Sequence, residues 1–236
     1  MDRLGETKIK GILFDVDGTL YHQTPLRLIM MGLLVFCHLN RPTALFRKLK
    51  IIVQYRKAQE VLRKTEKRQK QCHLKQLALT VEATGEALAF VSEVVTEWFE
   101  QRPLPFIALC RRRGMERAME TWQKNGLRLG IYSDYPAVHK INALGIAKYI
   151  SILVSPEHPE IEGFKPNSNG FIIAAREIDL NPSQILYVGD RPEVDGQGAV
   201  EAGMQVVILK GRFCRSIKDY AFCRSFSTLM NSIPLG

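Results

Sequence analysis

The sequence predicts an α/β fold: a Rossmann-like parallel sheet core with helices on both faces, plus an inserted all-α cap after the first strand. Two observations carry this prediction. Five short apolar runs alternate with mostly helical segments, and more than 100 residues separate the first run from the second. The length of 236 residues, with 46% hydrophobic and 24% charged residues, excludes a disordered or collagen-like chain.

The five apolar runs are continuous rather than alternating, which is typical of strands covered on both faces. They lie at residues 11–16, 129–133, 150–155, 185–189 and 205–209. Between most of them, apolar residues recur at helical spacing and a glycine often follows the last one, as at helix ends. These patterns predict helices at 115–124, 136–144 and 169–178.

The long interval between the first two strands predicts an inserted helical domain. Residues 63–73 lack an apolar face and predict a solvated helix surface. Further along, an apolar stripe indicates a helix that ends before Pro103. The stripe comprises Leu88, Val91, Val95, Trp98 and Phe99. We therefore expect a helical cap at 22–115 and a catalytic core formed by 1–21 and 116–236.

The longest apolar stretch, at 28–39, has only 12 residues, whereas a membrane-spanning helix needs about 20. We expect a buried core helix there, with an interfacial membrane segment as the alternative. The number of cysteines is odd and none lies in a CxxC pair, which indicates a reduced setting. The amino terminus has no apolar run behind its charges, so we expect a cytoplasmic protein.

Basic residues are concentrated in the predicted cap and account for the net charge of +9. Residues 41–75 hold 12 Lys and Arg against 2 Asp and Glu. This run has three interpretations: a solvated helical face, a surface that recruits an anionic substrate, or a docking site for an anionic membrane surface. Nucleic acid is disfavoured as a partner, because Phe46 and Tyr55 are the only aromatic residues in the run.

Polar residues follow the predicted strands at their carboxyl ends, where an open parallel sheet binds ligands. Asp15 and Asp17 lie one residue apart in an extended segment, so their side chains point to the same side. Close carboxylates repel each other, which favours a bound divalent cation, and Mg²⁺ suits an all-oxygen set. The other strand ends supply Ser133, Asp134, Lys165, Asp190 and Asp195. The chemistry that fits is phosphoryl transfer to a carboxylate, followed by hydrolysis.

Four ordered motifs resemble those of the haloacid dehalogenase (HAD) superfamily of aspartyl-phosphate hydrolases. They are DVDGTL at 15–20, IYSD at 131–134, FKPN at 164–167 and VGDRPEVD at 188–195. The resemblance covers residues 9–21 and about 126–210, and the text from 164 to 204 is similar to the phosphoglycolate-phosphatase-like branch. Four motifs in order, each at a predicted strand end, are far more specific than a lone DxD.

The resemblance implies roles for the residues of the first and third motifs. Asp15 resembles the nucleophile that becomes the aspartyl phosphate. Asp17 resembles the general acid that protonates the leaving oxygen and then the base that activates water. Lys165 would balance the charge between Asp15 and the phosphate.

The resemblance also implies which residues bind the phosphate and which bind the metal. The resemblance places Thr19, Ser133, Asp134 and Lys165 on the phosphate side, with Thr19 supporting the Asp17 loop, Ser133 acting through its hydroxyl and Asp134 through its backbone N–H. Asp15, the backbone carbonyl of Asp17 and Asp190 would hold Mg²⁺, with Asp195 as an outer-shell partner. Singly, each residue could instead be a turn former or helix cap.

The expected function is a Mg²⁺-dependent phosphatase that acts on a phosphorylated small molecule. Dehalogenases of the family lack the second acidic residue of the first motif, so the presence of Asp17 favours phosphate esters. Three alternatives stay open: a sugar phosphomutase, a phosphonate hydrolase that uses a cap lysine, and a membrane- or partner-docking protein on the same fold. The position of the insert implies a cap that closes over the site.

Overall fold

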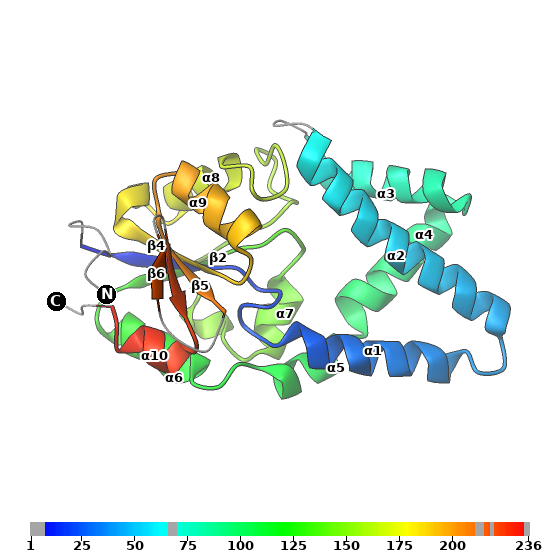
Figure 1. Ribbon diagram of the computed structural model, residues 1–236, viewed down its shortest axis with the longest axis horizontal. Helices are drawn as coiled ribbons and strands as arrows, with labels where there is room; N and C mark the ends of the chain where they lie inside the picture. Colours follow the sequence, from blue (N-terminus) through cyan, green and yellow to red (C-terminus); the bar gives the residue numbers. More distant parts are fainter. Residues whose placement is uncertain (1–7, 66–69, 211–214, 218–219, 234–236) are drawn as a thin grey trace.

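The protein is built around a seven-stranded sheet with strand order β3-β2-β1-β4-β5-β7-β6 (Figure 1). The computed structural model describes residues 8–65, 70–210, 215–217 and 220–233. The strands are β1 (Gly11–Phe14), β2 (Arg128–Tyr132), β3 (Ile152–Val154), β4 (Ile185–Gly189), β5 (Gln205–Leu209), β6 (Arg215–Ile217) and β7 (Tyr220–Cys223). Every neighbouring pair is parallel except β6 and β7. The predicted parallel sheet is confirmed.

The sequence prediction lacked the edge hairpin of β6 and β7. These strands have only three and four residues, RSI and YAFC. They are shorter than the five- and six-residue apolar runs that predicted the other strands, and the edge strand β6 has one apolar residue, as an edge that is covered on one side allows.

Helices cover both faces of the sheet, which explains why the strand sequences are apolar throughout. Phe14 points into one cluster, where it packs against Trp122 and Phe226, whereas its neighbour Leu13 points into the other. The first face is covered by α6 (Met115–Lys124), α7 (Val138–Ala143) and α10 (Phe226–Met230), and the second by α8 (Asn169–Glu177) and α9 (Gln197–Glu201). Short helical turns η3 (Ala147–Tyr149), η4 (Pro182–Gln184) and η5 (Pro192–Gly196) complete the core.

The all-α insertion after the first strand is confirmed. It consists of α1 (Gln23–Cys37), α2 (Pro42–Thr65), α3 (Cys72–Thr84), α4 (Leu88–Val95), η1 (Thr96–Gln101), α5 (Leu104–Ile107) and η2 (Ala108–Cys110). It has its own apolar cluster around Leu34, Ile51 and Trp98. Tyr21 and Arg111 form an antiparallel bridge where the chain leaves and re-enters the core; the cap bounds of 22–115 stay a prediction.

One expectation for the cap is wrong, and a second holds only in part. The 28–39 segment is not a buried core helix: Leu34 is buried, but Leu28 and Phe36 are 70% and 73% exposed. The segment 63–73 is not simply a solvated surface either, because the Arg63 side chain turns toward the core and Cys72 is buried; its residues 66–69 lie outside the described residues. Within the described chain, no helix combines the length and apolarity needed to cross a bilayer.

The aromatic packing beneath the sheet predicts a large stability effect. Phe226 is fully buried against Phe14 and Trp122, with ring centroids 6.1 and 6.3 Å away. Phe226→Ala should lower the free energy of unfolding by about 3–5 kcal/mol, because it removes the buried ring and leaves a cavity. Urea denaturation measures the effect. The matched control is Phe46→Ala at an exposed position of α2, where we expect the free energy of unfolding to change by no more than about 0.5 kcal/mol. Equal losses in the two variants would contradict the packing of α10.

Candidate active site

The predicted site residues meet at the carboxyl ends of β1, β2 and β4. These strands are neighbours, and Phe14 is paired with Ile131 on one side and with Val188 on the other. The backbone N–H of Asp15 continues the ladder by donating to the Val188 carbonyl at 2.9 Å. Loops that are far apart in the sequence are thereby held side by side at one edge of the sheet.

A buried lysine lies between two of the predicted carboxylates. The Lys165 side chain is only 2% exposed, and its Nζ lies 2.6 Å from Asp15 Oδ1 and 2.7 Å from Asp195 Oδ1. It also donates to the Tyr187 hydroxyl at 3.1 Å. Burial lowers the pKa of Lys165, but Asp15 and Asp195 raise it well above its ordinary value. Lys165 is therefore a fixed positive charge.

The three carboxylates near Lys165 carry more negative charge than this one lysine balances. Asp15, Asp190 and Asp195 each offer an oxygen, and the three oxygens lie within 4.8 Å of one another. Burial raises the pKa of Asp15, Lys165 opposes the rise, and the neighbouring carboxylates add to it. In the part of the chain that the structure describes, the Asp190 carboxylate has no hydrogen-bond or ion-pair partner. Clustered oxygens with unbalanced charge fit a hard divalent cation such as Mg²⁺.

The first motif approaches Asp190 closely, and glycine makes this approach possible. Gly18 has a φ of +102°, and a Cβ built on it would lie 2.2 Å from Asp190 Oδ2. Any other residue here would be strained and would displace Asp190.

Asp195 already uses both of its oxygens within the protein. Oδ1 accepts from Lys165 Nζ, and Oδ2 accepts the backbone N–H groups of Asp190 and Arg191 at 3.2 and 3.0 Å. This pattern fixes the loop that carries Asp190 and orients Lys165, and it favours the outer-shell role that we predicted for Asp195.

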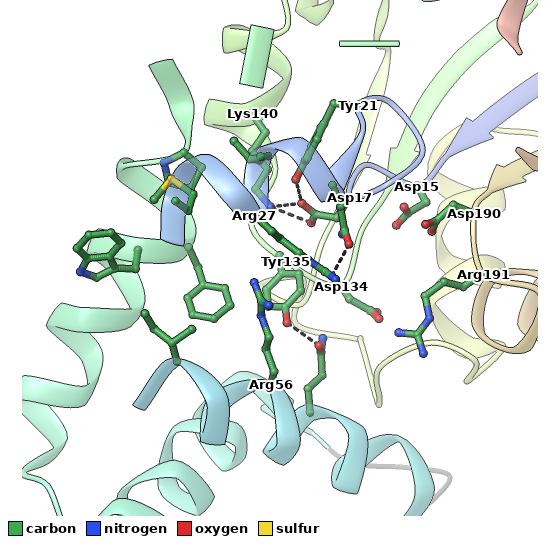
Figure 2. A pocket seen from close by; sticks show the side chains of 18 of the residues that line it. Asp15, Asp17, Tyr21, Arg27, Arg56, Asp134, Tyr135, Lys140, Asp190 and Arg191 are labelled. Atoms are coloured by element: carbon green, nitrogen blue, oxygen red, sulfur yellow. Dashed lines mark hydrogen bonds and ion pairs between the residues drawn. The ribbon is translucent and has the colours of Figure 1, made fainter. Parts of the chain in front are cut away.

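Asp17 has partners that sequence reasoning missed. Lys140 Nζ lies 2.8 Å from both carboxylate oxygens of Asp17, and the Tyr21 hydroxyl donates to Oδ1 (Figure 2). Burial raises the pKa of Asp17, but Lys140 and the hydrogen bonds outweigh it and lower the pKa below the ordinary value. Lys140 is only 6% exposed, and nothing in its helical sequence pattern distinguishes it from a surface lysine.

Of the predicted phosphate-side residues, Thr19 and Lys165 contact Asp15. Thr19 Oγ1 donates to Asp15 Oδ2 at 3.0 Å, so it supports Asp15 directly rather than the Asp17 loop. Ser133 is buried, and its hydroxyl accepts the Tyr135 N–H at 3.2 Å. Asp134 contributes its side chain as well as its backbone, because Oδ1 accepts the Lys165 N–H at 3.0 Å.

The cap completes the site through α2, which sequence reasoning also missed. Arg63 pairs with Asp134 Oδ2 at 2.6 Å, and Glu60 pairs with both Arg63 and Arg191. Gln59 accepts the Tyr135 hydroxyl at 2.5 Å. Arg63 and Glu60 belong to the basic run, and only the folded chain shows which members of that run face the core.

A cavity of ≈ 290 Å³ lies between the core carboxylates and the cap (Figure 2). Arg27 and Arg56 reach into it from α1 and α2. Among the described residues neither guanidinium has a carboxylate partner; Arg27 donates to Gln23, and Arg56 stacks over Phe99. The remaining cap wall is largely apolar: Leu26, Met30, Met31, Leu34, Leu49, Ile52, Trp98, Phe99 and Pro103.

This arrangement is suited to chemistry on an anion. A carboxylate, a fixed ammonium group and an oxygen-lined cation position converge at one end of a small cavity, and Arg27 and Arg56 also line it. An electrophile that bears several anionic oxygens would find its charge neutralised at the point where Asp15 can reach it.

Comparisons with known proteins agree with this geometry. The profile of the haloacid dehalogenase-like hydrolase family matches residues 9–203. Glyceraldehyde 3-phosphate phosphatase from Methanopyrus kandleri is 30% identical over 214 residues, 87% of this chain and 86% of that protein. Phosphoglycolate phosphatase from Escherichia coli is 32% identical over 84 residues, which cover 34% of this chain and 32% of that protein.

The fold recurs in solved structures. A HAD-hydrolase from Bacillus subtilis, solved bound to magnesium, superimposes with a TM-score of 0.67 and 16% identity. The match covers 96% of this chain and 99% of that one.

The contact between Lys140 and Asp17 leads to a test of the electrostatics. Lys140→Met keeps most of the buried stem but removes the charge that lowers the pKa of Asp17, so this pKa should rise. Carboxyl ¹³C NMR titration measures it directly. Lys148→Met, which removes an exposed lysine that pairs with Glu116, is the control and should leave Asp17 unchanged. An unaltered Asp17 titration in Lys140→Met would contradict the assignment.

Proposed function

Because the chain belongs to the haloacid dehalogenase-like hydrolase family, we propose that it is a Mg²⁺-dependent phosphatase that hydrolyses a small-molecule phosphomonoester through an aspartyl-phosphate intermediate. Its family and its phosphatase-named relatives make it a phosphohydrolase; the metal, the intermediate and the residue roles are the proposal. The observation that carries it is Lys165, buried between Asp15 and Asp195 and beside the carboxylate of Asp190, which has no partner among the described residues.

Asp15 is the proposed nucleophile. One of its oxygens contacts Lys165 Nζ and the other accepts from Thr19, so the carboxylate is held in a fixed orientation. Attack on phosphorus would form the bond between a carboxylate oxygen and phosphorus and break the bond to the substrate oxygen. Lys165 keeps its proton and balances the negative charge that Asp15 and the phosphoryl group share.

Asp17 is the proposed acid and base. It would donate a proton to the leaving oxygen and then accept one from the water that hydrolyses the aspartyl phosphate, which releases inorganic phosphate and restores Asp15. In the structure both oxygens of Asp17 face Lys140, and this contact favours the ionised form. The acid role therefore requires that Asp17 leave this pair when substrate binds.

The donor set fits Mg²⁺. Asp15 and Asp190 would hold the ion together with the backbone carbonyl of Asp17, while Asp195 orients the loop and Lys165. When bound, Mg²⁺ supplies positive charge to the phosphoryl oxygens. The similar HAD-hydrolase from Bacillus subtilis was solved bound to magnesium, which supports this choice.

The phosphate would be bound by the Ser133 hydroxyl and the backbone N–H of Asp134, beside Lys165. Arg27 and Arg56 add positive charge to the cavity and would attract a phosphate dianion. A volume of ≈ 290 Å³ lies at the small end of ligand pockets. The names of the relatives, a glyceraldehyde 3-phosphate phosphatase and a phosphoglycolate phosphatase, also support a phosphomonoester.

The phosphonate-hydrolase alternative requires a cap lysine at the cavity. Of the described residues that line it, the lysines are Lys140 and Lys165. Both come from the core and both are paired with carboxylates. The geometry therefore favours hydrolysis of a phosphate ester.

The nucleophile assignment is tested with a panel of soluble phosphomonoesters. The wild-type protein should release inorganic phosphate from at least one of them with Mg²⁺ and not with EDTA, and this release also separates a phosphatase from a phosphomutase. Asp15→Asn should reduce turnover below detection, because an amide is a poor nucleophile. The control is Asp179→Asn at an exposed carboxylate. Mg²⁺-dependent turnover that survives Asp15→Asn would exclude the proposed intermediate.

The metal assignment predicts a pH dependence. Burial and the neighbouring Asp195 raise the pKa of Asp190 to about 6, and a protonated carboxyl group cannot ligate Mg²⁺. Protons therefore compete with the metal below that pH, and the Mg²⁺ concentration for half-maximal activity should rise by up to about tenfold per pH unit below about pH 6. Mg²⁺ titrations at a series of pH values check this. A half-maximal concentration that stays constant below pH 6 would contradict the role of Asp190.

A further inference from the structure

Helix α1 carries apolar residues on two faces, and only one of them is covered. Leu26 and Leu34 are buried, and Ile29, Met30 and Leu33 pack around them. The other face, which we call the exposed face of α1, carries large apolar side chains at helical spacing that are each 41–73% exposed. It consists of Leu28, Val35 and Phe36, with Leu39 directly after the helix, and Met31 lies where this face borders the cavity. A contiguous exposed stripe of this kind marks an interaction surface.

The charge around this face indicates the partner. From residue 18 through residue 59 the chain contains seven Lys and Arg and no Asp or Glu. Arg47 and Lys48 pair with Glu86 and Glu97, and Arg27 and Arg56 line the cavity. Arg41, Lys50 and Lys57 have no carboxylate partner among the described residues. Arg41, which follows the exposed face, is itself exposed and has no ion-pair partner among the described residues. A partner that covers this apolar face, within a basic segment, should offer both apolar groups and negative charge. The surface of an anionic lipid bilayer offers both.

A second copy of the chain fits this face less well. A symmetric dimer would place the same patch of both subunits together, and each patch lies in a segment that is basic and free of acidic residues. Two such segments repel each other, whereas phosphate headgroups attract both. Charge complementarity therefore selects the lipid surface.

The position of α1 connects this face to the cavity. In Figure 1, α1 runs along the lower edge of the molecule, with α5 beside its amino-terminal part. The residues of its covered face, Leu26, Met30 and Leu34, line the cavity opposite the core carboxylates. Since no described helix can cross a bilayer, α1 would lie on the surface, with the apolar end of the cavity next to the lipid.

We propose that the exposed face of α1 docks the cap on an anionic lipid surface, where the cavity receives phosphomonoesters of amphiphilic molecules. The phosphate would reach the core carboxylates, and the apolar part would lie along the cap wall formed by Met30, Leu34, Leu49 and Ile52. The substrate part of this proposal rests on the proposed phosphatase function, whereas the docking part does not.

Docking is tested by co-sedimentation of the full chain with vesicles. One set contains phosphatidylcholine alone, and the other contains three parts phosphatidylcholine to one part phosphatidylglycerol. The wild-type protein should bind the anionic set at least about fivefold more strongly, and added salt should weaken this binding. The double variant Leu28→Ser/Phe36→Ser should lower binding to the anionic set by about tenfold, because it removes the two most exposed large apolar side chains of the helix.

The matched control is Ile172→Ser on α8 of the core, an isoleucine that is 51% exposed, and it should bind vesicles like the wild type. Neither set of substitutions touches the cavity, so turnover of a soluble phosphomonoester and the thermal unfolding midpoint should stay unchanged. Equal binding to both vesicle sets, or undiminished binding of the double variant, overturns docking. So does a dimer in light scattering that the double variant dissociates.

The substrate class is tested with two phosphates that share a headgroup, glycerol 3-phosphate and its 1-oleoyl ester. The ester should have the higher kcat/KM, and the double variant should reduce this advantage without affecting glycerol 3-phosphate. Equal or lower turnover of the ester overturns the amphiphilic substrate. If no phosphomonoester of any kind is hydrolysed with Mg²⁺, the proposed function fails, and the vesicle experiment still decides docking.

Discussion

A buried ammonium group organises the catalytic end of the sheet. A charge as enclosed as that of Lys165 is stable only when it is fully paired, because removing a partner leaves an uncompensated ion in a low-dielectric environment. Its partners come from three separate segments: Asp15 after β1, Asp195 in η5 and the Tyr187 hydroxyl on β4. One interaction therefore brings together loops about 150 residues apart in the chain, at the position where the sheet order already makes them neighbours.

The same network joins the core to the cap. Asp134 accepts the Lys165 N–H with one oxygen and pairs with Arg63 of α2 through the other. The residue that orients the lysine loop is thus also the residue that holds the cap. Cap position and site geometry are coupled through this carboxylate, which provides a physical route by which cap closure could complete the site.

Helix α1 relates the proposed chemistry to the proposed docking. Its covered face forms a wall of the cavity and its exposed face forms the edge of the cap. The net charge of +9 is therefore distributed unevenly between the core and the cap. The core is close to neutral, and the basic excess lies in the cap segment that includes α1.

The sequence by itself determined the sheet core, the helical insert and the set of carboxylates. Continuous apolar runs identify strands covered on both faces, and Asp15, Asp17, Lys165 and Asp190 lie in short motifs at the ends of those strands. Local patterns suffice there because hydrophobic periodicity and loop position depend on neighbours in the chain.

Only the tertiary structure decided the partners of those residues. Lys140, Arg63 and Tyr21 lie in segments whose local pattern is that of ordinary helix and linker. Likewise, the sequence of the apolar segment 28–39 does not show which of its residues pack against a neighbouring element. Long-range packing decides whether a charged or apolar side chain meets a partner or solvent, and sequence spacing carries no record of which distant element lies opposite.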